Sequence, residues 1–331
     1  QLGRYPRAGR MDFGADMVGD QPHDALALGR CQSLLRLDQA ARQPIDPAER
    51  GSTKMEYRPG DVRDADVLRT WFEGAEVVVH LAFLILGGSS QTTRAINVEG
   101  TLNAFRAAAD VGVKSFVYAS SVAAYGFHRD NPIGISEDWA TRPADRLFYA
   151  QEKAELEHQL QREAATRPQT ALYLLRPPIV LGPDAVGAKV SIPTVLEPLV
   201  RGLGAGLRRL PGLPVLVPDL PFQLIHQEDV AEALRLCVVG AGAPGAYNIA
   251  ADDVITGVDV ARELGLRAVR LPGWPVASLA RAVAKLPYLP SGAQWVEAMS
   301  HPAIMDTTKA RTQLGWRPRH SAIESLRSTF R

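Results

Sequence analysis

The sequence has few cysteines, no long apolar run and almost no net charge, and each shortage excludes a class of protein. Only two cysteines, Cys31 and Cys237, occur in 331 residues, and they match neither a zinc site nor a disulfide framework, which indicates a reducing cytoplasm. No apolar stretch approaches the ~20 residues that span a bilayer, and the arginine-bearing N-terminus lacks the apolar core of a signal peptide. A net charge of +1 gives no case for nucleic acid or anionic membranes as partners. We therefore expect a soluble cytoplasmic protein.

Apolar stretches of strand length alternate with stretches of helix length from about residue 54 onwards. The expected strands are residues 55–58, 76–81, 115–120 and 170–176, and the expected helices are residues 65–73, 92–110 and 149–165. Continuous apolar strands that alternate with helices are typical of a parallel sheet covered on both faces. The pattern predicts an α/β fold with a doubly wound, Rossmann-like parallel sheet.

Three polar side chains stand at spacings suited to proton transfer. Tyr149 and Lys153 lie four residues apart in Y-A-Q-E-K, so on a helix they share one face. A tyrosine with a pKa of about 10 needs a neighbouring cation to favour its phenolate, and Lys153 can be that cation. Ser121 follows a strand in Y-A-S-S-V-A-A-Y-G. Ser120 is the alternative hydroxyl, but the register on Tyr125 favours Ser121 because neighbouring strand residues face opposite ways.

These residues stand within a series of motifs that extends from about residue 38 to the C-terminus. The motifs are G-D-V-R-D (60–64), H-L-A (80–82), N-V-E-G-T (97–101), A-S-S-V-A-A-Y-G (119–126), L-R-P-P-I-V-L-G-P (175–183), L-I-H-Q-E-D-V-A-E-A-L (224–234) and D-T-T-K-A-R-T-Q-L-G-W (306–316). In this order they resemble the extended short-chain dehydrogenases, the NAD-dependent epimerase/dehydratase family. The resemblance implies a catalytic triad of Ser121, Tyr149 and Lys153, and hydride transfer to or from nicotinamide.

The resemblance also implies a set of cofactor-binding residues. Asp61 would meet the adenine with Val62 packed on it, and Leu81 and Ala82 would line the phosphates and ribose. Asn97 would lie near the nicotinamide. Without the resemblance, Asp61 is a turn residue after a Pro-Gly pair, and Asn97 is a helix-surface residue.

The remaining implied contacts concern the two riboses and the choice of cofactor. Lys153 would hold the nicotinamide ribose beside Tyr149, and Pro178 stands in the segment that wraps the nicotinamide. Asp38 ends the expected second strand, where a carboxylate accepts hydrogen bonds from the adenosine ribose and repels a 2'-phosphate. We therefore expect NAD as the cofactor, with NADP as the alternative because Arg42 softens the preference.

Two histidines stand at the ends of apolar strands, where a catalytic or metal-binding role has to be considered. His80 and His226 are expected to be packed or backbone-bonded rather than catalytic. No neighbouring Cys, His or carboxylate spacing indicates a metal, so no metal site is expected.

The N-terminus departs from the family pattern. The family opens with an apolar strand that runs into T-G-x-x-G-x-x-G, whose glycines admit the pyrophosphate at a helix N-terminus. Residues 1–13 contain three arginines and a proline, and the nearest glycine pattern, residues 14–19, lacks the middle glycine. Either the phosphate loop has decayed, or residues 1 to about 33 are not the natural sequence. We expect an irregular segment there and a sheet without its first strand, which makes activity of this chain doubtful.

The chain then divides into an atypical segment (1–33), a dinucleotide-binding domain (34–182) and a smaller C-terminal substrate lobe (183–331) with elements returning to the main sheet. Ile179 and Phe222 occupy positions where sugar-nucleotide epimerases carry an asparagine and an arginine. A small or apolar alcohol or ketone therefore ranks above a nucleotide sugar as the substrate. The alternative is a non-catalytic dinucleotide sensor or partner-binding protein on the same scaffold. The sequence leaves a homodimer open.

Overall fold

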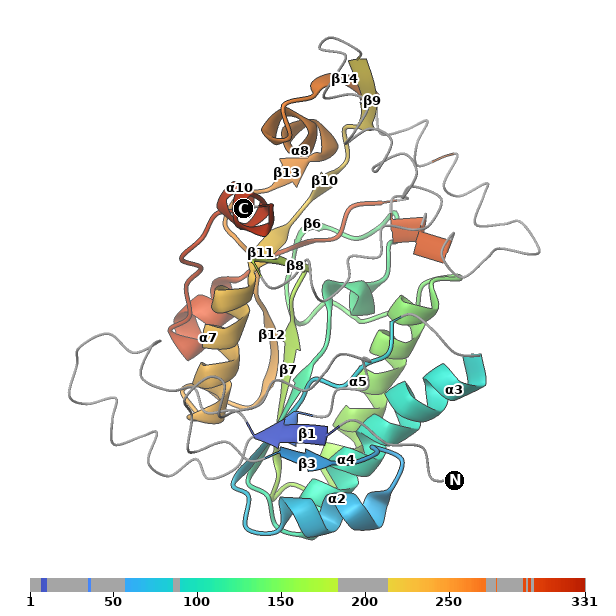
Figure 1. Ribbon diagram of the computed structural model, residues 1–331, viewed down its shortest axis with the longest axis vertical. Coiled ribbons are helices and arrows are strands. Elements are labelled where there is room, and N and C mark those ends of the chain that lie inside the picture. The colour runs from blue at the N-terminus through green and yellow to red at the C-terminus, as the bar shows by residue number, and fades with distance from the viewer. Residues whose placement is uncertain are drawn as a thin grey trace, which may run out of the picture.

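The computed structural model describes residues 7–10, 35–36, 57–85, 90–183, 214–271, 278, 294–295, 297–298 and 301–330. Its centre is a four-stranded parallel sheet in the order β12-β7-β5-β4, with helices on both sides (Figure 1). The strands are β4 (Val77–His80), β5 (Ser115–Ala119), β7 (Ala171–Arg176) and β12 (Gly245–Asn248). Each neighbouring pair runs parallel. The α/β fold with a parallel sheet is confirmed.

Helices cover both faces of this sheet because neighbouring residues of β5 point in opposite directions. Phe116 packs with α2 (Ala65–Phe72), α4 (Gly100–Asp110) and α5 (Phe148–Thr166) on one face. Val117 packs on the other face with Trp316 and with α7 (Gln227–Val238), which precedes β12. All four residues of β4 are buried, as expected of a strand covered on both sides.

The helix expected at residues 92–110 is built of three consecutive segments. They are α3 (Ser90–Arg94), a π-helical segment η3 (Ala95–Glu99) and α4. Near the C-terminus, η8 (Ala310–Leu314) is followed by α10 (Ala322–Thr329). The capping box expected at Ser321 begins α10: the Ser321 hydroxyl accepts the Glu324 amide at 3.1 Å, and Glu324 accepts the Ser321 amide at 2.8 Å.

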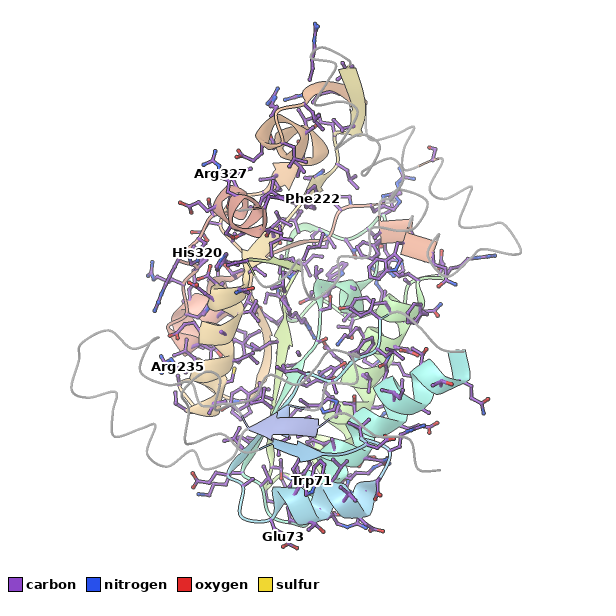
Figure 2. The ribbon with its side chains drawn as sticks, in the orientation of Figure 1. Trp71, Glu73, Phe222, Arg235, His320 and Arg327 are labelled. Carbon is purple, nitrogen blue, oxygen red and sulfur yellow. The ribbon has the colours of Figure 1, made fainter. Side chains whose placement is uncertain are left out.

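Short strands join the main sheet to a smaller lobe at one end of the molecule (Figure 1). Parallel pairs form between β8 (Ile179–Leu181) and β11 (Leu224–His226), between β6 (Ile133–Ile135) and β15 (Ile304–Met305), and between β9 (Pro214–Pro218) and β14 (Arg267–Leu271). An antiparallel pair forms between β10 (Pro221–Phe222) and β13 (Ile255–Thr256), which leads into α8 (Gly257–Glu263). Phe222 lies where this lobe meets the sheet (Figure 2). No helix in the described ranges is long and apolar enough to cross a membrane.

The N-terminal expectations need correction where the structure describes this region. β1 (Arg7–Arg10) is a strand, so the expected irregularity of residues 1–33 is wrong at these positions. β1 pairs antiparallel with β2 (Leu35–Arg36) and β3 (Tyr57–Pro59), outside the parallel sheet. The pairing uses backbone groups, which arginine carries as any residue does. Within the described residues, no N-terminal strand joins the parallel sheet. Residues 14–19 and Asp38 lie outside the described residues.

Candidate active site

The structure brings Ser121, Tyr149 and Lys153 together at the carboxyl end of β5. Ser121 follows this strand and caps η4 (Val122–Tyr125), where its hydroxyl accepts the Ala123 amide at 3.2 Å. Tyr149 and Lys153 lie one turn apart on α5, and the Ser121 hydroxyl lies close enough to Tyr149 to lower the pKa of its phenol. The Lys153 Nζ lies 5.8 Å from the centre of the Tyr149 ring. A hydroxyl, a phenol and an amine thus meet at the strand end where doubly wound sheets bind ligands.

Lys153 is almost completely buried, with 3% of its surface exposed. Its Nζ donates to the Tyr118 hydroxyl at 3.0 Å and to the Ala119 carbonyl at 2.6 Å, and it lies 3.9 Å from the centre of the Phe83 ring. Burial lowers the pKa of Lys153 to about 7, because the ammonium loses the water that would solvate it. Glu157 opposes this shift by its negative charge. The side chain therefore titrates near neutral pH in the chain without ligands.

Tyr149 is held between two aromatic side chains. Phe83 meets its ring edge-on at a centroid distance of 5.3 Å, and Trp295 lies tilted against it at 5.4 Å. Burial raises the pKa of Tyr149, and the hydrogen bond with Ser121 opposes the rise. Tyr149 is thus a protonated phenol in this state and can donate a proton.

A buried polar network lies behind the three residues. Glu157, one turn beyond Lys153, is fully buried and accepts the Ser120 hydroxyl at 2.5 Å. It also pairs with Arg176 at 2.5 Å, and Arg176 donates to the Tyr125 hydroxyl at 2.6 Å. Ser120 therefore points into this network while Ser121 faces Tyr149, in keeping with the register expected from the sequence. Sequence reasoning missed Glu157, although its spacing of four from Lys153 places it on the same helix face.

Asn97 lies on η3 and braces the chain that follows β4. Its amide nitrogen donates to the Leu84 carbonyl at 2.9 Å and to a Glu152 carboxylate oxygen at 2.7 Å, and its oxygen accepts the Leu84 amide at 2.6 Å. Because Asn97 has no exposed surface, the alternative of a helix-surface residue is wrong. Burial raises the pKa of Glu152.

Asp61 and Val62 occupy the turn between β3 and α2. The Asp61 carboxylate accepts the backbone amide and the Nε of Arg63, both at 2.9 Å, and this pairing lowers the pKa of Asp61. Val62 is 1% exposed and packs against Gly100, where an added Cβ would lie 2.4 Å from the valine side chain. Val62 is therefore a core residue at this turn, and Asp61 is tied to its neighbour.

The other implied cofactor residues border the same strand ends. Leu81 and Ala82 directly follow β4, and Ala82 is buried. His80, the last residue of β4, lies 3.0 Å from the Thr101 hydroxyl through its Nε2. Burial lowers the pKa of His80 to about 3, so it is a neutral, packed histidine. Pro178 is buried beside the turn that holds Ser121.

A distant segment caps the helix that carries Tyr149 and Lys153. The Glu297 carboxylate accepts three consecutive backbone amides before α5, those of Asp145 at 2.6 Å, Arg146 at 2.8 Å and Leu147 at 2.8 Å. These amides precede the helix, where donors have no partner within the helix itself. The residue was not identified from the sequence, because nothing near it indicates a helix start some 150 positions away.

The comparisons with known proteins agree on family and fold. The profile of the NAD-dependent epimerase/dehydratase family matches residues 18–250. An uncharacterized protein of Mycobacterium tuberculosis (strain H37Rv) is 26% identical over 287 residues, which cover 84% of this chain and 71% of that protein. The 3beta-hydroxysteroid-dehydrogenase/decarboxylase isoform 2 of Arabidopsis thaliana is 28% identical over 309 residues, covering 84% of this chain and 52% of that protein. The crystal structure of the Bordetella bronchiseptica enzyme WbmG in complex with NAD has a TM-score of 0.61 at 19% identity, and the match covers 90% and 84% of the two chains. That last likeness shows the fold.

Proposed function

Because the chain belongs to the NAD-dependent epimerase/dehydratase family, a family of enzymes, we propose that it moves a hydride to or from a secondary alcohol or ketone. The observation that carries the proposal is the meeting of Ser121, Tyr149 and Lys153 at the carboxyl end of β5. NAD is the proposed cofactor, and NADP is the alternative. NAD supplies the hydride chemistry at its nicotinamide ring.

The described residues fit the nicotinamide end of such a cofactor. An ammonium has three donors, and Lys153 uses two of them on Tyr118 and Ala119. The third donor is available for a ribose hydroxyl. Leu81, Ala82 and Pro178 border the same strand ends and would line the cofactor, and Asp38 would meet its adenosine ribose. We propose Asn97 as a support for this wall rather than a direct ligand, since its amide is already bonded to Leu84 and Glu152.

Tyr149 would exchange the proton. As a phenol it donates to the oxygen of a ketone, and in the opposite direction it accepts the proton of an alcohol. Ser121, whose hydroxyl lies near Tyr149, would hold the same substrate oxygen. Lys153 in its charged form would favour the phenolate that results. Phe83 and Trp295 pack on the Tyr149 ring and limit the access of water to it.

The walls of the site favour a neutral, apolar substrate. Trp295, from the C-terminal part of the chain, presents an aromatic surface beside Tyr149. Ile179 is 54% exposed and Phe222 is partly exposed, where an amide or a guanidinium would serve a diphosphate. The sterol-type name of the Arabidopsis relative supports the same choice. We therefore propose an apolar secondary alcohol or its ketone as the substrate class.

Two measurements test this function on the purified full chain. NADH fluorescence should change on binding, and turnover should be seen with neutral cyclic alcohols or ketones rather than with UDP-glucose. Tyr149→Phe should lower kcat by roughly 10²- to 10⁴-fold and leave NADH affinity nearly unchanged. Tyr173→Phe is the matched control, because that hydroxyl bonds the Gly242 carbonyl on the other face of the sheet.

Two outcomes would contradict the proposal. Full activity of Tyr149→Phe would show that Tyr149 is not the acid. Failure to bind either NADH or NADPH would contradict the proposed hydride transfer. Turnover of UDP-glucose alone would be consistent with the triad but would contradict the apolar substrate.

We also propose a cytoplasmic location, from the scarcity of cysteine, and a homodimer in solution. Cell fractionation would check the location, and sedimentation would check the homodimer.

A further inference from the structure

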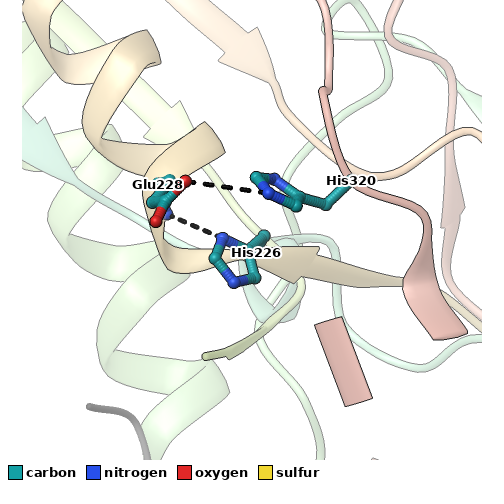
Figure 3. A group of neighbouring side chains, drawn as sticks. All are labelled: His226, Glu228 and His320. Carbon is teal, nitrogen blue, oxygen red and sulfur yellow. Dashed lines mark hydrogen bonds and ion pairs between the residues drawn. The ribbon is translucent and has the colours of Figure 1, made fainter. Parts of the chain in front are cut away.

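Two histidines and a carboxylate converge where α7 begins (Figure 3). His226 ends β11, Glu228 lies in the first turn of α7, and His320 precedes α10. Each residue offers one ligand atom, and these atoms lie within 4.8 Å of one another. His320 lies on the outer side of the molecule above α7 (Figure 2). Solvent reaches Glu228 and His320, whereas His226 is buried behind them.

The hydrogen bonds of His226 fix which ring nitrogen carries its proton. Its Nδ1 lies 3.3 Å from the backbone amide of Glu228, which can only donate, so Nδ1 holds the lone pair. The proton is then on Nε2, which donates to the Ser328 hydroxyl at 3.1 Å. The Glu228 amide is at the long end of the hydrogen-bond range and competes weakly for that lone pair. His226 thus directs its Nδ1 lone pair toward the backbone amide of Glu228, and a metal bound at Nδ1 would replace this long hydrogen bond (Figure 3).

The partner of His320 fixes its tautomer in the same way. Its Nδ1 lies 3.2 Å from a carboxylate oxygen of Asp229, which is almost completely buried and can only accept. The Nδ1 therefore donates, and in the neutral ring the lone pair is on Nε2, 3.7 Å from the Glu228 carboxylate. Backbone amides of Arg319 and His320 hold Asp229 in place at 2.9 and 3.1 Å.

This arrangement is the one that metal-binding histidines use. Such a histidine binds the metal with one nitrogen and donates the other N–H to a carboxylate, carbonyl or similar group that orients the ring. Ser328 orients His226 in this way, and Asp229 orients His320. Two imidazole nitrogens with one carboxylate suit Zn²⁺, whereas Mg²⁺ and Ca²⁺ prefer oxygen ligands.

We propose that His226 Nδ1, His320 Nε2 and the Glu228 carboxylate bind a divalent transition-metal cation, with Zn²⁺ the best fit. Zinc bonds of about 2 Å require these atoms to draw together. The two imidazole rings are stacked with centroids 3.9 Å apart, so a ring must turn to aim its lone pair. His320 and Glu228, whose side chains are 30% and 57% exposed, have room to move and leave a fourth position for water.

The cation would join three segments that meet at one edge of the molecule. His226 belongs to β11, Glu228 to α7, and His320 to the chain before α10, while Ser328 on α10 holds the His226 ring. The carboxylates of Glu228 and Asp229 offset the positive end of the α7 dipole, which alone would disfavour a cation there. A ligand that binds only the folded state raises its stability, so binding of the cation should raise the Tm.

The test uses the full chain, stripped of metal by EDTA and then titrated with ZnCl₂ in a calorimeter. We expect one zinc site that depends on this cluster, a rise in Tm on saturation, and no displacement by millimolar Mg²⁺. Glu228→Gln and His320→Gln should each abolish that site. Ser328→Ala, which removes only the orienting partner of His226, should weaken it by about 10-fold or more. Glu232→Gln is the matched control, because it lies on the same helix and pairs with Arg235.

The variants separate this cluster from any other zinc-binding residues among the seven histidines of the chain. If the parent chain binds no zinc, or if Glu228→Gln binds zinc as tightly as Glu232→Gln does, the proposal is wrong. Should His320→Gln fail to fold by circular dichroism, the exposed Glu228 still decides the matter. None of these residues touches the triad, so the result is independent of the proposed hydride transfer.

Discussion

Removal of the Glu297 carboxylate should destabilise the protein more than removal of any surface carboxylate. Glu297 is 6% exposed and accepts the amides of Asp145, Arg146 and Leu147 at 2.6 to 2.8 Å. In Glu297→Ala the buried Leu147 amide loses its partner outright, at about 1–3 kcal/mol. The amides of Asp145 and Arg146 are nearer to solvent and can recruit water, so each should lose about 1 kcal/mol. We expect a total loss of roughly 3–5 kcal/mol.

The measurement is urea unfolding followed by circular dichroism, with the loss taken from the shift in midpoint at constant slope. Glu297→Gln retains one acceptor oxygen and should lose about 1–2 kcal/mol. The control is Glu263→Gln, whose partner Arg327 is 52% exposed, so its loss of stability should be smaller than that of either Glu297 variant. Because α5 begins at Phe148 and carries Tyr149, kcat should fall along with stability. A loss below 0.5 kcal/mol for Glu297→Ala, on the scale of ordinary surface substitutions, would refute this reasoning.

Three further changes test the interior of the site. Burial holds the pKa of Lys153 at about 7, below its usual 10.5, so the unfolded chain binds more protons between these values and the free energy of unfolding should rise with pH across that window. Lys153→Met should flatten this rise. If denaturant titrations at several pH values give the same pH dependence of the free energy of unfolding for Lys153→Met and the parent, the burial of Lys153 is not its cause. Gly126 has φ 65° and ψ 175°, and an added Cβ would lie 2.9 Å from the Arg142 carbonyl, so Gly126→Ala should cost at least about 1–3 kcal/mol in thermal unfolding. Glu157→Gln leaves Arg176 buried without its anion and should cost about 3–5 kcal/mol, whereas a change in Tm too small to measure would contradict the ion pair.

Local patterns predicted the parts of the fold and site that depend on neighbouring residues. Continuous apolar stretches gave β4, β5 and β7 to within a residue or two, because buried parallel strands need such runs. The two-residue repeat of a strand separated Ser121 from Ser120, and the four-residue repeat of a helix placed Lys153 beside Tyr149. These rules act over a few residues, so the sequence alone was sufficient to predict where these strands lie and which of these side chains share a face.

Contacts between distant segments could not be predicted in this way. The spacing of Glu297 gives no sign that it caps α5, and His226 and His320 meet only because α7 and the chain before α10 pack together. The arginines of the N-terminal segment argued against a strand, yet β1 forms through its backbone. In each case the fold brings together residues that are far apart in the sequence, and composition and periodicity carry no information about such pairs.

The pairing of β6 with β15 has a consequence for when the fold is completed during synthesis of the chain. α5 leaves the ribosome early, whereas Glu297, its cap, follows about 150 residues later, and Ile304 and Met305 of β15 later still. At translation rates of about 5–20 residues per second, the helix with Tyr149 and Lys153 waits roughly 8–30 s for its last supports. During that time the nascent chain has α5 without the carboxylate that holds its first residues in place. Turnover of the proposed reaction should therefore begin only after residues 304 and 305 have emerged and paired with β6.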